Sequence, residues 1–155
     1  MIEKTVTYVN ENGAKCEETH SYKMSFDYVD YILRYDRLYE NDVIFLKDSF
    51  KENDGREVPI VYTGNGHSCY DASNHLGFAV LENREDGVIA KCTFAKYDTG
   101  LIAKDLIVNT KEFGISVYAN RINYDISQLP IRKVQSANVM DVIAVPSVAV
   151  PRVKE

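Results

Sequence analysis

The sequence lacks the long apolar segments that mark membrane and exported proteins. No apolar run approaches the roughly 18 residues that a membrane-spanning helix needs. The first residues, MIEKTVTYVNENG, are polar and lack the apolar core of a signal peptide. From these two absences we expect a cytosolic protein that does not act on membranes.

An excess of basic charge is also missing. The chain has 18 Lys and Arg residues against 23 Asp and Glu residues, which gives a net charge of -5 and a pI near 5.2. Nonspecific binding to nucleic acid needs a basic face. The balance therefore disfavours nucleic acid as a partner and leaves protein substrates open.

Cysteine is scarce, and the sequence lacks the common metal-binding motifs. Cys16, Cys69 and Cys92 are odd in number and widely spaced, which predicts reduced thiols and no disulfide framework. His67, Cys69 and His75 fall within the segment HSCYDASNH and could supply metal ligands. No CxxC or HExxH motif accompanies them, and structural zinc normally needs four ligands. We interpret the segment as a loop that holds two histidines, and expect no metal or cofactor.

The sequence does contain many short segments with the composition and period-two alternation of β-strands. An Asn-Gly turn signal at residues 12–13 predicts a hairpin within residues 1–24. The polar REDG segment predicts a second hairpin between LGFAVLEN and GVIAKCTF. Further strands are predicted at 29–36, 56–62, 113–122 and 138–145.

One segment changes period. In DTGLIAKDLIVNT, the apolar residues Ile102, Ala103, Leu106 and Ile107 form one stripe of a helix, which Asp98 or Thr99 could cap. The 155 residues are enough for one domain with a sizeable core. The predicted fold is α+β, with a closed or nearly closed β-barrel of about seven strands and one to three flanking helices.

A serine interrupts one predicted strand, FGISVYANRI. Ser116 lies between Ile115 and Val117 and gains nothing from the packing that favours strands. It is either a small residue tolerated in a crowded strand or a nucleophile held on a rigid element.

Several segments, taken in order, resemble one family. They are VPIVY, NGHS, LGFAVLENREDGVIAKCTF, TGLIAKDLI and FGISVYAN, preceded by DVIFLKDSFKEN and followed by NVMDVIAVP. Their order is similar to that of the tailed-phage prohead maturation proteases, whose fold is related to the herpesvirus assembly proteases. The resemblance runs from about Asp42 to Pro146 and is densest from Val58 to Asn120. Residues 1–41 match weakly, and the whole chain, 1–155, is expected to form a single domain.

The resemblance implies a catalytic triad of Ser116 as nucleophile, His67 as base and Asp141 as the carboxylate that orients the histidine. A serine hydroxyl needs a base to accept its proton, and a carboxylate fixes the tautomer of that base. Outside the resemblance, His67 reads as a solvated loop residue and Asp141 as an outward-facing charge. The segment around His67 is longer than the family pattern, so His75 is the alternative base.

The same resemblance implies a serine endopeptidase that trims capsid and scaffold proteins by acyl-enzyme chemistry. It would act inside the assembling procapsid in the host cytoplasm, without metal or nucleotide, as a homodimer or higher oligomer. Arg121 or Arg132 could stabilise the developing oxyanion. The alternatives are a non-catalytic β-barrel scaffold or capsid-assembly binding protein, and an unrelated small binding domain.

Overall fold

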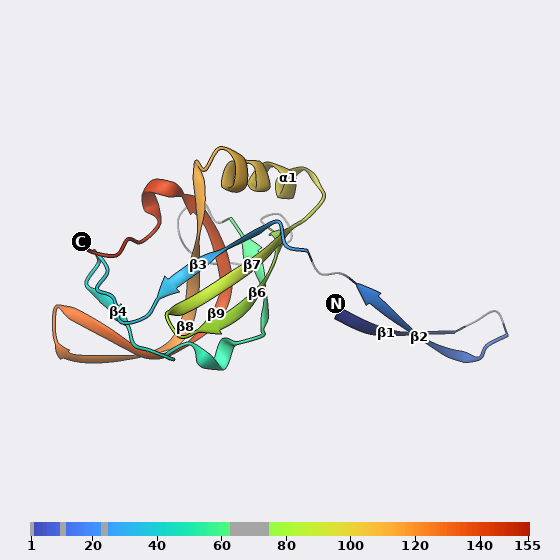
Figure 1. Ribbon diagram of the computed structural model, residues 1–155, viewed down its shortest axis with the longest axis horizontal. Coiled ribbons are helices and arrows are strands. Elements are labelled where there is room, and N and C mark those ends of the chain that lie inside the picture. Colours follow the sequence, from blue (N-terminus) through green and yellow to red (C-terminus); the bar gives the residue numbers. More distant parts are fainter. Residues whose placement is uncertain (1, 10–11, 23–24, 63–74) are drawn as a thin grey trace.

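The computed structural model describes residues 2–9, 12–22, 25–62 and 75–155. Strands β1 (Ile2–Val9) and β2 (Lys15–Tyr22) form a separate two-stranded antiparallel sheet. This hairpin lies apart from the rest of the chain (Figure 1). Gly13, in the turn, has a φ of 79°, a conformation that glycine adopts without steric cost. The hairpin predicted from the Asn-Gly signal is confirmed.

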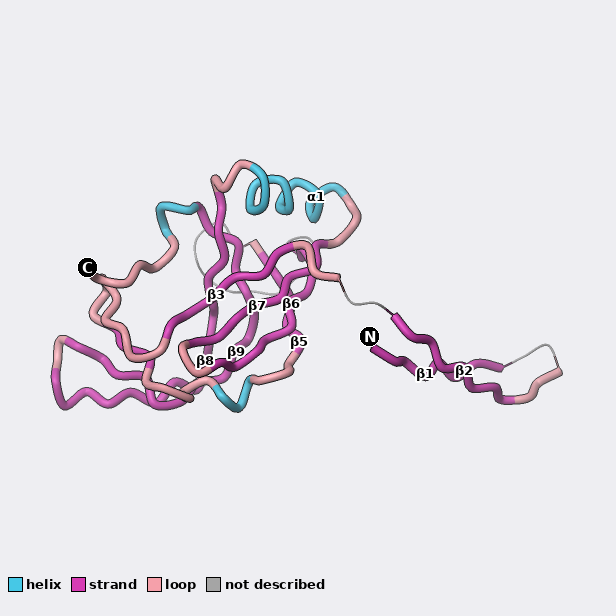
Figure 2. Tube along the Cα trace, in the orientation of Figure 1, coloured by secondary structure: helices cyan, strands magenta, loops and turns pink. Residues whose placement is uncertain are grey.

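The main body is a seven-stranded sheet that curls into an open half-barrel (Figures 1 and 2). The strand order is β3-β7-β6-β5-β9-β4, and β8 pairs with the other edge of β9. The strands are β3 (Tyr28–Arg34), β4 (Val43–Phe45), β5 (Glu57–Val61), β6 (His75–Arg84), β7 (Gly87–Phe94), β8 (Phe113–Gln128) and β9 (Ile131–Pro146).

The predicted β-rich α+β class is confirmed, but the barrel is not closed. In the described part of the chain, β3 pairs only with β7, and β8 pairs only with β9. Closure would require a ladder between β3 and β8. Instead, Val150 and Pro151 of the C-terminal segment line a hollow together with Ile32 and Ile115 of these two strands. Each strand therefore keeps one edge without a β-ladder partner.

The REDG hairpin forms as predicted, because Arg84 of β6 pairs with Gly87 of β7 across a two-residue turn. Alternate residues of these strands, such as Ala79 and Leu81, are buried in the concave side of the sheet. The same apolar core takes in residues from every strand of the half-barrel. Its largest fully buried members include Phe50, Leu33, Ile60, Leu81 and Ile107.

Strands β8 and β9 form a hairpin of two 16-residue strands, the longest in the protein. The sequence predicts them only in part, at 113–122 and 138–145. The missed part of β8, 123–128, is mostly exposed, so no alternation marks it. The missed part of β9, 131–137, buries only Val134 and Ala137, which are three positions apart and therefore give no period of two. The tip of this hairpin projects from the body (orange, lower left in Figure 1).

The predicted helix is present as α1 (Asp98–Lys104), followed by a π-helical turn at Asp105–Asn109. It lies across one end of the half-barrel (Figure 2) and buries Gly100, Ala103 and Ile107. The predicted stripe was partly wrong, because Ile102 is 59% exposed. The helix approaches the preceding chain so closely that a Cβ on Gly100 would lie 2.1 Å from the Ala95 carbonyl oxygen. The expected side-chain cap is absent, and Tyr97 occupies the N-cap position. Two short 3₁₀ turns, Lys51–Asn53 and Ser147–Ala149, complete the described helical segments.

A buried asparagine completes the hydrogen bonding of β9. On one edge, β9 pairs in parallel with β4 at Arg132–Val134 and with β5 at Val142–Ile143. Between these ladders, Asn53 receives a hydrogen bond from the Val139 N–H at 2.9 Å and donates to the Ala137 carbonyl at 3.0 Å. Its carboxamide thus takes the place of a strand where β4 and β5 leave a gap. Asn53 is only 1% exposed, so water does not offer these groups an alternative.

Replacing Asn53 by Ala should destabilise the protein by about 3 kcal/mol, because a buried N–H and a buried C=O lose their partners. Urea denaturation should show this as a lower midpoint with an unchanged slope. The control is Asn123→Ala, which removes an exposed 2.7 Å bond to Ser136 and should cost less than about 0.5 kcal/mol. Equal losses in the two variants would contradict the bridging role of Asn53.

Candidate functional site

The register of β8 and β9 brings two of the predicted site residues close together. Ser116 lies opposite Ile143, and Asp141 lies opposite Tyr118. Ser116 and Asp141 are therefore diagonal neighbours, two positions apart on adjacent strands. Diagonal pairs in an antiparallel sheet are roughly 7–8 Å apart. Residues 25 positions apart in sequence are thus placed within reach of one common group.

Both side chains belong to the face of the sheet that points away from the apolar core. The flanking residues Ile115, Val142 and Ala144 are part of that core. Side chains alternate between the two faces of a strand. Ser116 and Asp141 consequently lie on the convex face, which we call the outer face.

Asp141 is buried on this outer face, with only 3% of its surface exposed. The interpretation of Asp141 as an ordinary outward-facing solvated charge is therefore wrong. A carboxylate taken out of water is costly unless polar groups satisfy it. Its neighbours on β9, Val139 and Val142, are fully buried. Burying the Asp141 carboxylate at this position costs free energy, which a role as a surface charge does not explain.

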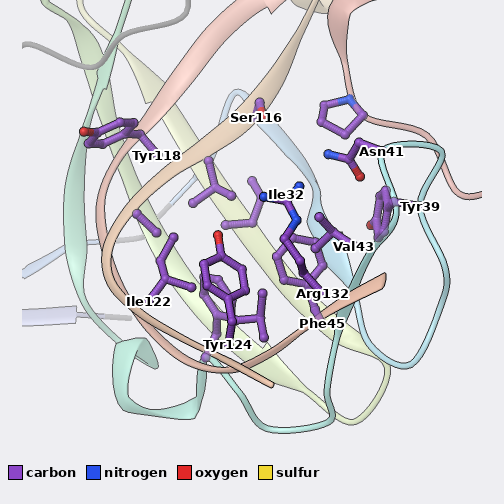
Figure 3. Close-up of a pocket in the computed structure, with 15 residues that line it drawn as sticks. Ile32, Tyr39, Asn41, Val43, Phe45, Ser116, Tyr118, Ile122, Tyr124 and Arg132 are labelled. Carbon is purple, nitrogen blue, oxygen red and sulfur yellow. The ribbon is translucent and has the colours of Figure 1, made fainter. Parts of the chain in front are cut away.

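The sequence analysis missed Tyr118, which faces Asp141 across the strands and is 37% exposed. A signal for it was available, because Tyr118 is two residues from Ser116 and residues i and i+2 share one face of a strand. Figure 3 shows its ring directed away from the groove described below. Tyr118 thus belongs with Ser116 and Asp141 on the outer face.

His67 and Cys69 lie outside the described residues. The alternative base, His75, is at the start of β6, opposite Val61. Val61 pairs with Ile143 of β9, and Ile143 pairs with Ser116 of β8. His75 and Ser116 therefore lie in one row across the sheet, separated by three strand spacings. Three strand spacings amount to roughly 14 Å, too far for a hydrogen bond. The His75 Nδ1 instead lies 2.7 Å from the Tyr97 hydroxyl, which donates to the His75 carbonyl.

Neither predicted oxyanion-stabilising arginine has a described contact with Ser116. The Arg132 guanidinium lies 5.7 Å from the centre of the Tyr124 ring. Arg121 lines a separate hollow beside Arg56. The described structure therefore assigns no oxyanion donor.

An apolar groove of about 290 Å³ opens on the unclosed side of the half-barrel (Figure 3). Strands β3, β4 and β8 supply most of its walls. Ser116 borders the groove, and Arg132 is a cationic group within it. Its apolar lining includes Ile32, Val43, Phe45, Val117 and Ile122. Because β8 has no ladder partner on this side, an extended peptide can add to its edge and place alternate side chains in the groove.

The described residues contain no group of three His, Cys, Asp or Glu side chains that could hold a metal ion. They also contain no helix with the length and apolarity needed to cross a bilayer.

Comparison with known protein families, with curated proteins and with solved structures yields no match for this chain.

Cys92 has a free thiol that is fully buried in the core. Burial, with smaller contributions from Asp30 and Asp27, raises the pKa of its thiol to about 12. The reactive thiolate fraction at pH 8 should then be about a thousandfold lower than in an unfolded chain.

We therefore expect iodoacetamide to leave Cys92 unmodified in the native protein at pH 8 and to modify it after unfolding in urea. Peptide mass spectrometry can follow this residue separately from the other two cysteines. Rapid native labelling would show that the thiol is not held protonated in a closed core.

Proposed function

We propose that this protein is a serine endopeptidase that cleaves capsid and scaffold proteins during procapsid maturation. Ser116 would be the nucleophile, His67 the general base and Asp141 the orienting carboxylate. The observation that supports this most is the diagonal placement of Ser116 and the buried Asp141 on one face of two paired strands. A hydroxyl and a carboxylate so placed can bind opposite sides of one imidazole ring.

His67 lies outside the described residues, but chain length permits this role. Val61, at the end of β5, is two strands from Ser116, which is roughly 10 Å. The six residues from Val61 to His67 can span up to about 20 Å. An imidazole from this segment could therefore reach the outer face beside both Ser116 and Asp141.

In the proposed reaction, His67 accepts the proton of the Ser116 hydroxyl as Oγ attacks the scissile carbonyl carbon. Asp141 holds the ring and stabilises the imidazolium. The imidazolium then donates its proton to the leaving amine, the acyl-enzyme forms, and water releases the second product. No step requires a metal ion or a nucleotide.

The free edge of β8 and the adjoining groove suit an extended segment of a protein substrate. We propose that such segments are exposed linkers in assembling capsid and scaffold proteins, within the procapsid in the host cytoplasm. A homodimer or higher oligomer would make activity depend on local concentration.

Wild-type protein should react with a fluorophosphonate probe, with the Ser116 Oγ displacing fluoride from phosphorus. Intact-mass measurement should show one added phosphonyl group, which Ser116→Ala abolishes. Ser127→Ala is the matched control, since it changes a serine at the exposed end of the same strand, and it should label fully. If the wild-type protein is folded but never labels, the groove would favour a non-catalytic assembly-binding protein.

Substitution of histidines separates the two candidate bases. His67→Ala should lower peptide cleavage by about 10³-fold or more, as expected for loss of a triad member. His75→Ala should retain most activity, because His75 is too far from Ser116 along the sheet. The measurement is kcat/KM on one quenched peptide for both variants, with folding checked by circular dichroism. The reverse order of losses would assign the base to His75.

A further inference from the structure

A second hollow, of about 300 Å³, lies beside the bulged part of the β8–β9 hairpin and contains two arginines. Arg56 follows the 3₁₀ turn after β4, and Arg121 comes from β8. Arg121 has a φ of 50°, which is uncommon for a residue with a side chain. The ladder shifts between Asn120 and Asn123, so Arg121 lies in a β-bulge. Bulges commonly redirect a side chain next to a functional site.

The guanidinium of Arg56 is held in place, but only some of its N–H donors form hydrogen bonds. Its Nη1 donates to Asn53 Oδ1 at 2.8 Å and to Asn138 Oδ1 at 2.9 Å. A guanidinium has five N–H donors. The donors on Nε and Nη2 form no hydrogen bond to the described residues. This edge has the geometry that binds a carboxylate through two parallel hydrogen bonds.

Neither arginine of the hollow forms an ion pair with a described residue. Glu52 is part of the lining, but no ion pair joins it to Arg56 or Arg121 in the described structure. Charged groups elsewhere on the surface do pair, as Arg84 does with Glu82 at 2.6 Å. Two arginines without an ion pair to the described residues thus lie in one hollow of a protein with a net charge of -5.

The hollow also lies on the same outer face as Ser116. Asn138, which holds Arg56, pairs with Asn120 and alternates with the core residues Ala137 and Val139. Asn120 is four residues from Ser116 along β8. At about 3.3 Å per residue, the hollow begins roughly 13 Å from the proposed nucleophile. An extended peptide bound along β8 would cover this distance in about four residues.

We propose that the hollow of Arg56 and Arg121 is a specificity subsite for an acidic side chain of the protein substrate. Asp or Glu, three to five residues from the scissile bond, would bind the free edge of Arg56 and the charge of Arg121. This assignment rests on the proposed endopeptidase function. The apolar groove would accept alternate side chains of the same bound segment.

The first test reads cleavage specificity. The protein, residues 1–155, is incubated with a peptide mixture of known sequences, and the cleavage sites are identified by mass spectrometry. Asp and Glu should be enriched three to five residues to one side of the cut. For a matched pair of peptides with Glu or Gln at that position, Arg121→Gln should reduce the preference for Glu about tenfold, mainly through KM. Arg84→Gln, which removes an exposed arginine elsewhere, should leave it unchanged.

The second test does not need catalysis. N-acetylglutamate N-methylamide is titrated into the Ser116→Ala protein, and the arginine Nε–H resonances are followed by NMR. Arg56 should shift saturably with this probe and not with the glutamine analogue, while Arg84 serves as the internal control. Arg121→Gln should weaken the binding without breaking the hydrogen bonds of Arg56.

The two tests distinguish the two proposals. Cleavage without acidic preference, and without a specific Arg56 shift, would overturn the subsite and leave the protease intact. A specific Arg56 shift in a protein that never cleaves peptides would support a carboxylate site and overturn the endopeptidase. Failure of both would remove both assignments.

Discussion

The architecture depends on β9 having hydrogen-bond partners along both of its edges. One edge is covered by β8 through a long antiparallel ladder. The other edge is shared by two short parallel ladders, with β4 and β5, and by the carboxamide of Asn53 between them. A buried backbone group without a partner is costly, so a side chain that closes this gap allows one strand to link two parts of the sheet.

The same ladder determines the candidate site. Ser116 and Asp141 share the outer face only because β8 and β9 pair in this register. A slip of one residue in a single strand would move every side chain of that strand to the opposite face. The buried residues on the concave side, including Ile115, Val139 and Val142, disfavour such a slip because it would expose them. The core therefore positions the site from the opposite, concave face of the sheet.

The sequence predicted those parts of the fold whose information is local. The β6–β7 hairpin has alternating apolar residues and a polar turn, and both signals lie within 20 residues. The parallel pairing of β4 and β5 with β9 joins residues 89 and 82 positions apart, respectively, and no local pattern records it. Asn53 was missed for a related reason. Its buried carboxamide forms hydrogen bonds with two backbone groups of β9 that are distant in sequence. The distal part of β8 was missed because it is mostly exposed, and the first half of β9 because its two buried residues, Val134 and Ala137, do not follow a period of two.

The candidate site was predictable to a similar extent. Ser116 stood out as a hydroxyl in an apolar strand, and Asp141 as a carboxylate in another. That they are neighbours follows only from the register. Arg56 gave no signal, and Arg121 was considered only as an oxyanion donor. Single arginines are common on surfaces, and the convergence of these two requires the bulge at Asn120–Asn123.

The charge of the protein as a whole also bears on how such a hollow would act. A net charge of -5 repels an acidic segment at long range, so the two arginines would not accelerate its encounter with the protein. Salt screens charges over about 10 Å at 0.1 M, and the attraction of a small cationic hollow operates within that distance. Its contribution would therefore come after encounter, in the alignment of a segment already bound along β8. Two neighbouring arginines on an acidic protein would thus help to select among segments that are already bound, and would contribute little to capturing segments from solution.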